Sequence, residues 1–215
     1  MIDAFDELIE QAGPVCAQQR GLDRLRAHLL GQLVCLGEHT VSGLLCATGQ
    51  QFGDWAADYR FYTKPRVDPQ LLWDTVRRHI EGRLAPGQAL VVALDDSILR
   101  KRGPKIPGVA WRPDPLGAPF QVNFIRAQRV LQMAAALPEG TEGAARTVPI
   151  DFAQAPSASR PRKTAPPEAW EAFRQQQKEL NINRQAVIRL QALVDRRARE
   201  DQPRPLWAAV DGRFT

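Results

Sequence analysis

The sequence is organised around two apolar stretches that each run into aspartate. Residues 89–97 read ALVVALDDS, and residues 206–213 read LWAAVDGR. A strand that is apolar on both faces belongs in the middle of a covered sheet, so a carboxylate at its end lies on the rim of a rigid platform. Carboxylate oxygens are preferred ligands of Mg²⁺, and two such strand ends brought together predict a divalent-metal site. The alternative is that these aspartates only end strands and start turns.

The amino-acid composition is that of an ordinary globular protein. Its 215 residues are 44% apolar, which is enough for one large domain or two small ones with a real core. The apolar runs are shorter than the roughly 20 residues that a bilayer span needs, and the N-terminus, MIDAFDE, is acidic where a signal peptide is basic. We therefore expect a cytoplasmic protein with no membrane partner. The three cysteines and three histidines lack metal-binding spacing, which argues against zinc and disulfides.

Charge is unevenly distributed along the chain. Residues 1–87 carry 9 Lys/Arg against 11 Asp/Glu, a net −2, whereas residues 88–215 carry 20 against 13, a net +7. The basic surface therefore belongs to the half that holds the aspartates. A polyanion is its natural partner, although basic surfaces also occur without such a role.

The first 87 residues predict an all-helical region. A short helix through residues 2–9 precedes Gly13-Pro14, and a second helix carries one buried stripe of Leu22, Leu25, Leu29, Leu33 and Leu36. Short helices over residues 40–49 and 55–62 fit either a helix-turn-helix or a plain helical hairpin. Asp68-Pro69 opens a last helix, which residues 85–87, Ala-Pro-Gly, end at a domain boundary.

Residues 88–215 predict a mixed α/β domain. Its strands are expected at residues 89–97, 120–137, 146–152 and 206–210, the third being an edge strand because of Pro149. For residues 120–137 strand and helix compete, and the β-branched and aromatic content favours a strand. Residues 100–119 are rich in proline, glycine and charged residues, and we expect them to form an excursion from the sheet, that is, a loop that pairs with no strand. Residues 153–167 form a linker, and one long helix runs from Pro166-Pro167 to before Pro203. The order is thus strand, strand, strand, helix, strand.

These residues resemble a known family. LDDS at 94–97 with the basic loop and IPGVAW at 106–111, followed by AVDGRFT at 209–215, resembles the catalytic domain of bacterial insertion-sequence transposases of the DDE superfamily. HTVSGLL at 39–45 and the stretch 55–62 look like the helical N-terminal region of those proteins, so the resemblance spans most of the chain. It implies a ribonuclease-H-like fold with one carboxylate on the first strand and another just beyond the fourth.

The resemblance also implies a site. Neighbouring side chains on a strand point to opposite faces, and the family pattern of aspartate followed by a hydroxyl residue selects Asp96, with Asp95 as its supporting neighbour. Asp211 is then the second ligand of Mg²⁺ or Mn²⁺, and two such ions about 4 Å apart promote phosphodiester cleavage. The basic residues that follow are expected to hold the DNA of transposon ends, in association with the nucleoid: Arg100, Lys101, Arg102 and Lys105.

The chain departs from the family in one respect. Members carry a third carboxylate, a glutamate on a helix beyond the second aspartate, and this chain ends four residues after Asp211. We therefore expect the N-terminal part of a transposase with a sheet incomplete at its C-terminus and little catalysis alone. Apolar surface around Trp207 and Val210 is expected to drive association with full-length transposase or with a second copy. The alternatives are a non-catalytic DNA-binding or inhibitory fragment, and another ribonuclease-H-like nuclease.

Overall fold

The computed structural model describes residues 2–101, 103, 105–118, 120, 123–137, 146–200 and 204–211. The chain forms two compact units, Met1–Gly82 and Arg83–Thr215. Among the described residues, no helix is long and apolar enough to cross a bilayer. The functions expected for the two parts of the chain stay predictions.

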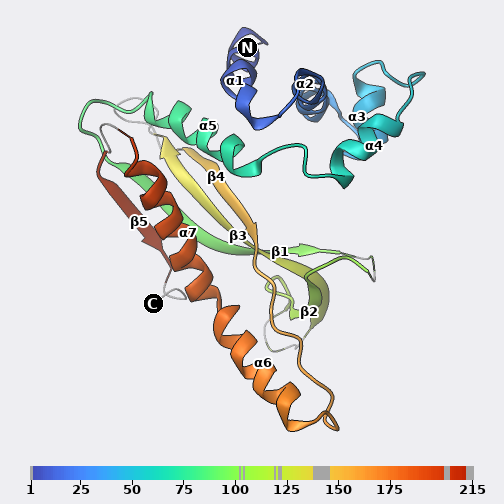
Figure 1. The fold of residues 1–215 in the computed structure, drawn as a ribbon, viewed down its shortest axis with the longest axis vertical. Helices are drawn as coiled ribbons and strands as arrows, with labels where there is room; N and C mark the ends of the chain where they lie inside the picture. Colours follow the sequence, from blue (N-terminus) through green and yellow to red (C-terminus); the bar gives the residue numbers. More distant parts are fainter. Residues whose placement is uncertain are drawn as a thin grey trace. The chain divides into compact units, whose positions relative to one another are not determined.

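The first unit is all-helical, as the sequence predicts. Its elements are α1 (Ile2–Gln11), the 3₁₀ turn η1 (Gly13–Val15), α2 (Gln19–Val34), α3 (Val41–Ala47), α4 (Ala56–Thr63) and α5 (Pro69–Glu81), shown in blue to green in Figure 1. Asp68 caps α5, because its side chain accepts hydrogen bonds from the backbone N–H groups of Gln70 and Leu71. Val15, Leu25 and Phe61 are among the buried residues at the centre of this unit.

The expected leucine stripe on α2 is confirmed only in its first half. Leu25 is buried, but Leu33 and Leu36 are exposed. The helix ends at Val34, so Leu36 lies outside it and no longer shares its periodicity. The end of α2 instead packs through Gly31, where an added Cβ would lie 3.0 Å from the Cβ of Leu44 on α3.

The tight helix-turn-helix considered for α3 and α4 does not form. Residues 48–55 connect these two helices, which is longer than the three- or four-residue turn of that motif. α3 packs against α2 instead. A DNA-binding surface in this unit would therefore differ in geometry from a helix-turn-helix.

The second unit is built on a five-stranded mixed sheet. Its strands are β1 (Leu90–Arg100), β2 (Val109–Pro113), β3 (Phe124–Leu137), β4 (Arg146–Gln154) and β5 (Leu206–Val210). β3 lies between β1 and both β2 and β4, with every one of these pairings antiparallel, and β5 pairs with β1 in parallel. The order β4-β3-β1-β5 is that of a ribonuclease-H-like sheet, so the mixed α/β expectation is confirmed.

Two elements differ from the sequence expectation. Residues 109–113, predicted to lie in an unpaired excursion, form β2 along the first part of β3. The ladder tolerates Pro113 because the residue ends an edge strand. The single long helix is divided into α6 (Pro167–Glu179) and α7 (Ile182–Arg197). Asn181 makes this break, because its side chain accepts hydrogen bonds from the N–H groups of Asn183 and Arg184 and caps α7.

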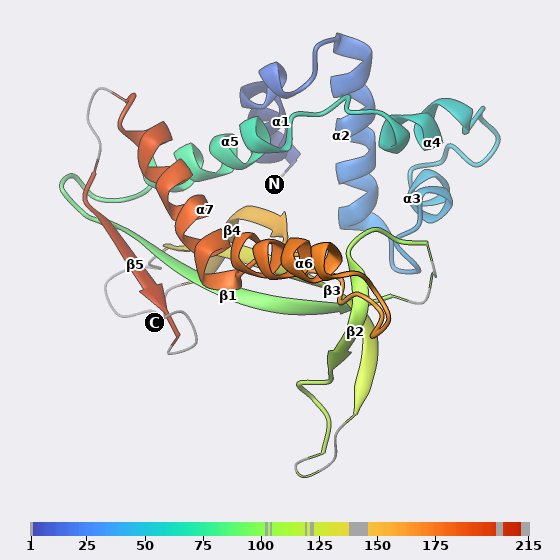
Figure 2. The same ribbon diagram turned by 60° about the horizontal axis from the view of Figure 1, so that its bottom comes forward.

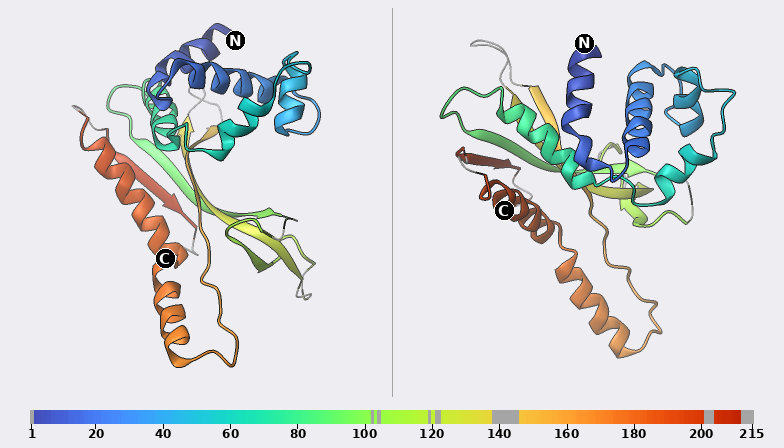
Figure 3. Two further views of the ribbon diagram at one scale, coloured as in Figure 1. Left: turned by 45° about the vertical axis from the view of Figure 1, so that its right-hand side comes forward. Right: turned by 45° about the horizontal axis from the view of Figure 1, so that its top comes forward.

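One face of the sheet is covered by α7. Figures 1 and 3 show this helix running alongside β1 and β5. Leu193 of α7 is buried at 2% exposure, and Arg189 of the same helix forms an ion pair with the buried Asp151 of β4. Burying one leucine stabilises the fold by about 2 kcal/mol, so helix and strand are joined by both apolar and charged contacts.

Apolar surface remains exposed in this unit, as expected. Trp207 and Val210 on β5 are 66% and 42% exposed, and Val187 on α7 is 63% exposed. Association through this surface stays a prediction.

Candidate active site

The two neighbouring aspartates of β1 lie on opposite faces of the sheet. Leu90, Val92 and Leu94 are all buried, at 0%, 0% and 2% exposure. Because side chains alternate along a strand, Asp96 continues this covered face and Asp95 belongs to the other. The burial of the two residues agrees, since Asp95 is exposed and Asp96 is partly buried.

Extending the register of β1 and β5 by one residue assigns Asp211 to the face of Asp95. The parallel ladder between β1 and β5 ends with Leu94 paired to Val210, and the next residue on each strand is an aspartate. Residues directly opposite each other in a ladder point to the same side, and neighbouring strands are about 4.8 Å apart. Continuing the register by one residue therefore places Asp211, just after the end of β5, beside Asp95 in the middle of β1. Asp95 is also oriented locally, because its Oδ1 accepts a 2.8 Å hydrogen bond from the backbone N–H of Asp96.

Asp96 lies in a different, strongly cationic environment. The pKa of Arg112 on β2 is lowered, first by burial and then by the neighbouring charge of Arg129 on β3, and the charge of Asp96 partly offsets this lowering. Arg112 donates from Nη1 to Ser157 Oγ at 3.0 Å, and Arg129 donates from Nε to the carbonyl oxygen of Ala155 at 3.2 Å.

The carboxylate of Asp96 places a negative charge beside Arg112 and Arg129, which we call the arginine cluster. Arg112 is 8% exposed, and its Nε and Nη2 have no hydrogen-bond partner among the residues that the structure describes. A buried cation without a nearby anion is costly, so Asp96 stabilises the two arginines electrostatically. A carboxylate next to two fixed cations is also a weaker ligand for Mg²⁺, because the cations repel the metal ion. Whether Asp96 is a metal ligand therefore stays a prediction. The register of β1 and β5 instead favours Asp95 as the neighbour of Asp211.

The basic residues after β1 are arranged along the connection between β1 and β2. Arg100 is exposed and pairs with Asp114, and Lys101 continues the ladder by donating its backbone N–H to the carbonyl oxygen of Arg126 at 2.9 Å. Lys105 is exposed in a turn, whereas Arg102 lies outside the described residues. Gln128 of β3 donates from Nε2 to the carbonyl oxygen of Pro107 at 2.7 Å, so the connection crosses β3 on the face of Asp95.

The donor set on this face fits a hard divalent ion. Within the part of the chain that the structure describes, no group of three or more His, Cys, Asp or Glu side chains is gathered for a metal. Two carboxylates are nevertheless a common protein contribution to Mg²⁺, which keeps several waters and takes further oxygens from substrate phosphates. Asp95 and Asp211 therefore supply a plausible pair of protein ligands.

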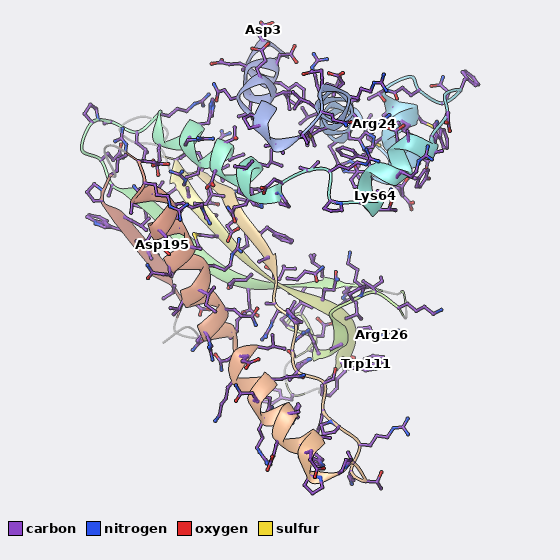
Figure 4. The ribbon with its side chains drawn as sticks, viewed as in Figure 1. Asp3, Arg24, Lys64, Trp111, Arg126 and Asp195 are labelled. Carbon is purple, nitrogen blue, oxygen red and sulfur yellow. The ribbon has the colours of Figure 1, made fainter. Side chains whose placement is uncertain are left out.

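Sequence reasoning missed several residues of this region. Arg112 and Arg129 were not singled out, and neither were Trp111 and Arg126, which Figure 4 labels at one end of the domain. The available signal was the apolar run Val109-Ala110-Trp111, which follows Pro107-Gly108 and predicts a short strand after a turn.

The N-terminal unit contains a second polar cluster. His28 is 3% exposed, with Nε2 2.9 Å from Asp58 Oδ1 and Nδ1 2.6 Å from Tyr62 Oη. Arg24 donates from Nε to the same Asp58 oxygen at 2.8 Å. Burial, followed by the charge of Asp58, raises the pKa of Tyr62. Both ring nitrogens of His28 thus have partners, which is typical of a structural core histidine.

Comparison with known proteins gives one match. The profile of a family described as DDE superfamily endonuclease matches residues 16–211, which is most of the chain. No curated protein and no solved structure matches significantly.

Proposed function

The chain belongs to the DDE superfamily endonucleases, and we propose that it acts as a transposase that cuts and joins DNA at insertion-sequence ends, with Asp95 and Asp211 as metal ligands. The observation that carries the assignment of these residues is the parallel register of β1 and β5, whose extension pairs the two aspartates. The family match supports a nuclease or transposase activity, and the basic charge of residues 88–215 supports DNA as its substrate.

Each residue has a distinct task in this proposal. A bound Mg²⁺ or Mn²⁺ would activate the attacking water or hydroxyl and stabilise the leaving oxygen of the phosphodiester. Asp95 and Asp211 would hold the ion where the ladder between β1 and β5 ends, and this ladder fixes the separation of the two strands. Lys101 and Lys105 contact the phosphate backbone beside the site. Asp96 balances the charge of Arg112 and Arg129 on the covered face and so holds β1 in position.

The test compares two aspartate variants with a control variant, Asp195→Asn. Asp95→Asn, Asp211→Asn and Asp195→Asn are assayed for Mg²⁺- and Mn²⁺-dependent cutting of a plasmid that carries the DNA flanking the gene. Asp195 is exposed on α7, which covers the opposite face, so its variant should cut normally. The first two variants should lose at least about 100-fold in rate, in the range of a lost transition-state interaction, while still binding the DNA.

Other outcomes would assign the chain differently. Normal cutting by Asp95→Asn together with a properly folded but inactive Asp96→Asn would make Asp96 the first ligand. Cutting without strand joining would favour a different ribonuclease-H-like nuclease. DNA binding by the wild-type chain without any metal-dependent cutting would favour the second candidate, a non-catalytic fragment that binds transposon ends or associates with a complete transposase.

A further inference from the structure

A two-stranded extension of the sheet carries unusual apolar exposure. We call it the arm: β2, residues 124–128 of β3, and the described residues between them, 114–118, 120 and 123. Figure 2 shows it projecting beyond the rest of the sheet of the second unit. Its large apolar side chains lie in solvent, with exposures of 68% for Trp111, 88% for Leu116, 106% for Phe120 and 51% for Phe124. Apolar patches of this kind mark interaction surfaces.

The register places cations beside these apolar side chains. Trp111 is the ladder partner of Arg126, and the backbone of Lys101 bonds to Arg126 from the other side. Lys101, Arg126 and Trp111 therefore form a row across three strands on one face. Phe124 is the ladder partner of Pro113, which makes it a diagonal neighbour of Trp111 at about 7–8 Å.

The arm and its surroundings are strongly basic. Residues 97–129 contain seven Lys/Arg and a single acidic residue, Asp114. That one carboxylate is paired with Arg100 and almost fully buried. The ligand that fits exposed aromatic rings among cations is a strand of nucleic acid with unpaired bases, since it offers phosphates to the cations and flat base faces to the rings. Paired bases inside a duplex are already stacked on each other and do not offer those faces.

The arm lies on the same face as the proposed metal ligands. Asp95 and Lys101 are both odd-numbered residues of one continuous strand, and Asp211 follows the register of Asp95. The six residues from Asp95 to Lys101 span about 20 Å, a length that about six nucleotides of one strand cover at 3.4 Å each. One DNA strand can therefore reach both places.

We propose that the arm binds unpaired bases of the DNA substrate, with Trp111 and Phe124 stacking on bases while Lys101 and Arg126 contact phosphates. This inference rests on the proposed function, because it takes the DNA to lie at Asp95 and Asp211. It adds a preference for opened or single-stranded DNA next to the cutting site.

The experiment measures binding of the 215-residue protein to two fluorescein-labelled probes in 150 mM salt. One probe is a 30-base-pair duplex, and the other is the same duplex with a central four-nucleotide mismatched bubble. We expect the bubble to bind about tenfold more tightly. Trp111→Ala should weaken bubble binding by about tenfold, within the range measured for loss of one stacked base, and change duplex binding less than twofold. Trp111→Phe should restore most of the preference, which also shows that the fold is intact.

Two further measurements sharpen the result. 2-Aminopurine placed in the bubble should be quenched by the wild-type protein and less so by Trp111→Ala, because stacking quenches this base. Val187→Ala removes a similarly exposed apolar side chain from α7, on the opposite side of the sheet, and should behave as the wild type.

The outcomes separate this inference from the proposed function. No binding to either probe would overturn both. Equal binding of the two probes with no effect of Trp111→Ala would overturn the role of the arm and leave the DNA activity standing. Equal weakening of both probes by Trp111→Ala would show contact with duplex DNA and overturn the stacking of unpaired bases.

Discussion

Replacing Asp96 by asparagine should destabilise the second unit, whereas the same change at Asp95 should not. Asp96 is partly buried, its charge acts on Arg112, which is 8% exposed, and the register makes it a diagonal neighbour of Arg129 on the same face. Breaking a fully buried ion pair costs about 3–5 kcal/mol. Because Asp96 is only partly buried, we expect about 2–3 kcal/mol, or a fall in Tm of about 5–10 °C. Asp95→Asn keeps the oxygen that accepts from the N–H of Asp96, so its cost should stay within about 0.5 kcal/mol.

Urea unfolding followed by circular dichroism measures both free energies. A double-mutant cycle with Arg112→Met tests the cause, because removing the arginine should remove most of the penalty of Asp96→Asn. The coupling between the two positions should reach about 1–2 kcal/mol. Equal stability of Asp95→Asn and Asp96→Asn, or a coupling near zero, would refute the view that Asp96 acts through the arginines.

Three further predictions concern packing and ionisation. Arg189→Met should lower the free energy of unfolding by about 2–3 kcal/mol in urea titrations, because Asp151 would stay buried without its ion-pair partner. The pKa of Tyr62 is raised in the folded state, so the stability that it contributes is complete below pH 10 and is lost as pH rises through the folded pKa. Tyr62→Phe should therefore show a smaller loss of stability than the wild type between pH 9 and pH 12, and an equal loss would contradict this reasoning. Gly31→Ala should cost about 1–3 kcal/mol in thermal unfolding, because the new methyl group would lie 3.0 Å from the Cβ of Leu44; an unchanged Tm would mean that α3 shifts without strain.

Local signals in the sequence were sufficient for most of the elements. Apolar runs predicted β1 and β5, and a short apolar stretch with Pro149 predicted β4. β3 was predicted from its β-branched and aromatic residues, since its apolar residues fit neither period. Asp68-Pro69 predicted the start of α5, because its cap is made by residues next to each other in the chain. The same kind of signal predicted aspartates at the ends of the first and last strands. This is correct for Asp211, which follows β5, but wrong for β1, which continues through Asp95 and Asp96 to Arg100 because it pairs there with β3. The break between α6 and α7 was missed although Asn181 is a good helix cap, since the apolar stripe appeared to continue through it.

The sequence by itself determined that aspartates follow apolar strands in a basic domain, because composition, periodicity and chain order are local properties. Only the register of the sheet, a property of the tertiary structure, favours Asp95 over Asp96 as the proposed partner of Asp211. Asp95 and Asp96 are adjacent in the chain, and their faces were distinguished by which side of β1 is buried under α7 and by the register of β5, more than a hundred residues away. β2 also depended on tertiary structure, because its proline-bounded residues 109–113 become a strand only by pairing with β3. The short apolar run Val109-Ala110-Trp111 indicates a strand but carries no information about its partner, which is why the arm and the arginine cluster emerged only from the fold.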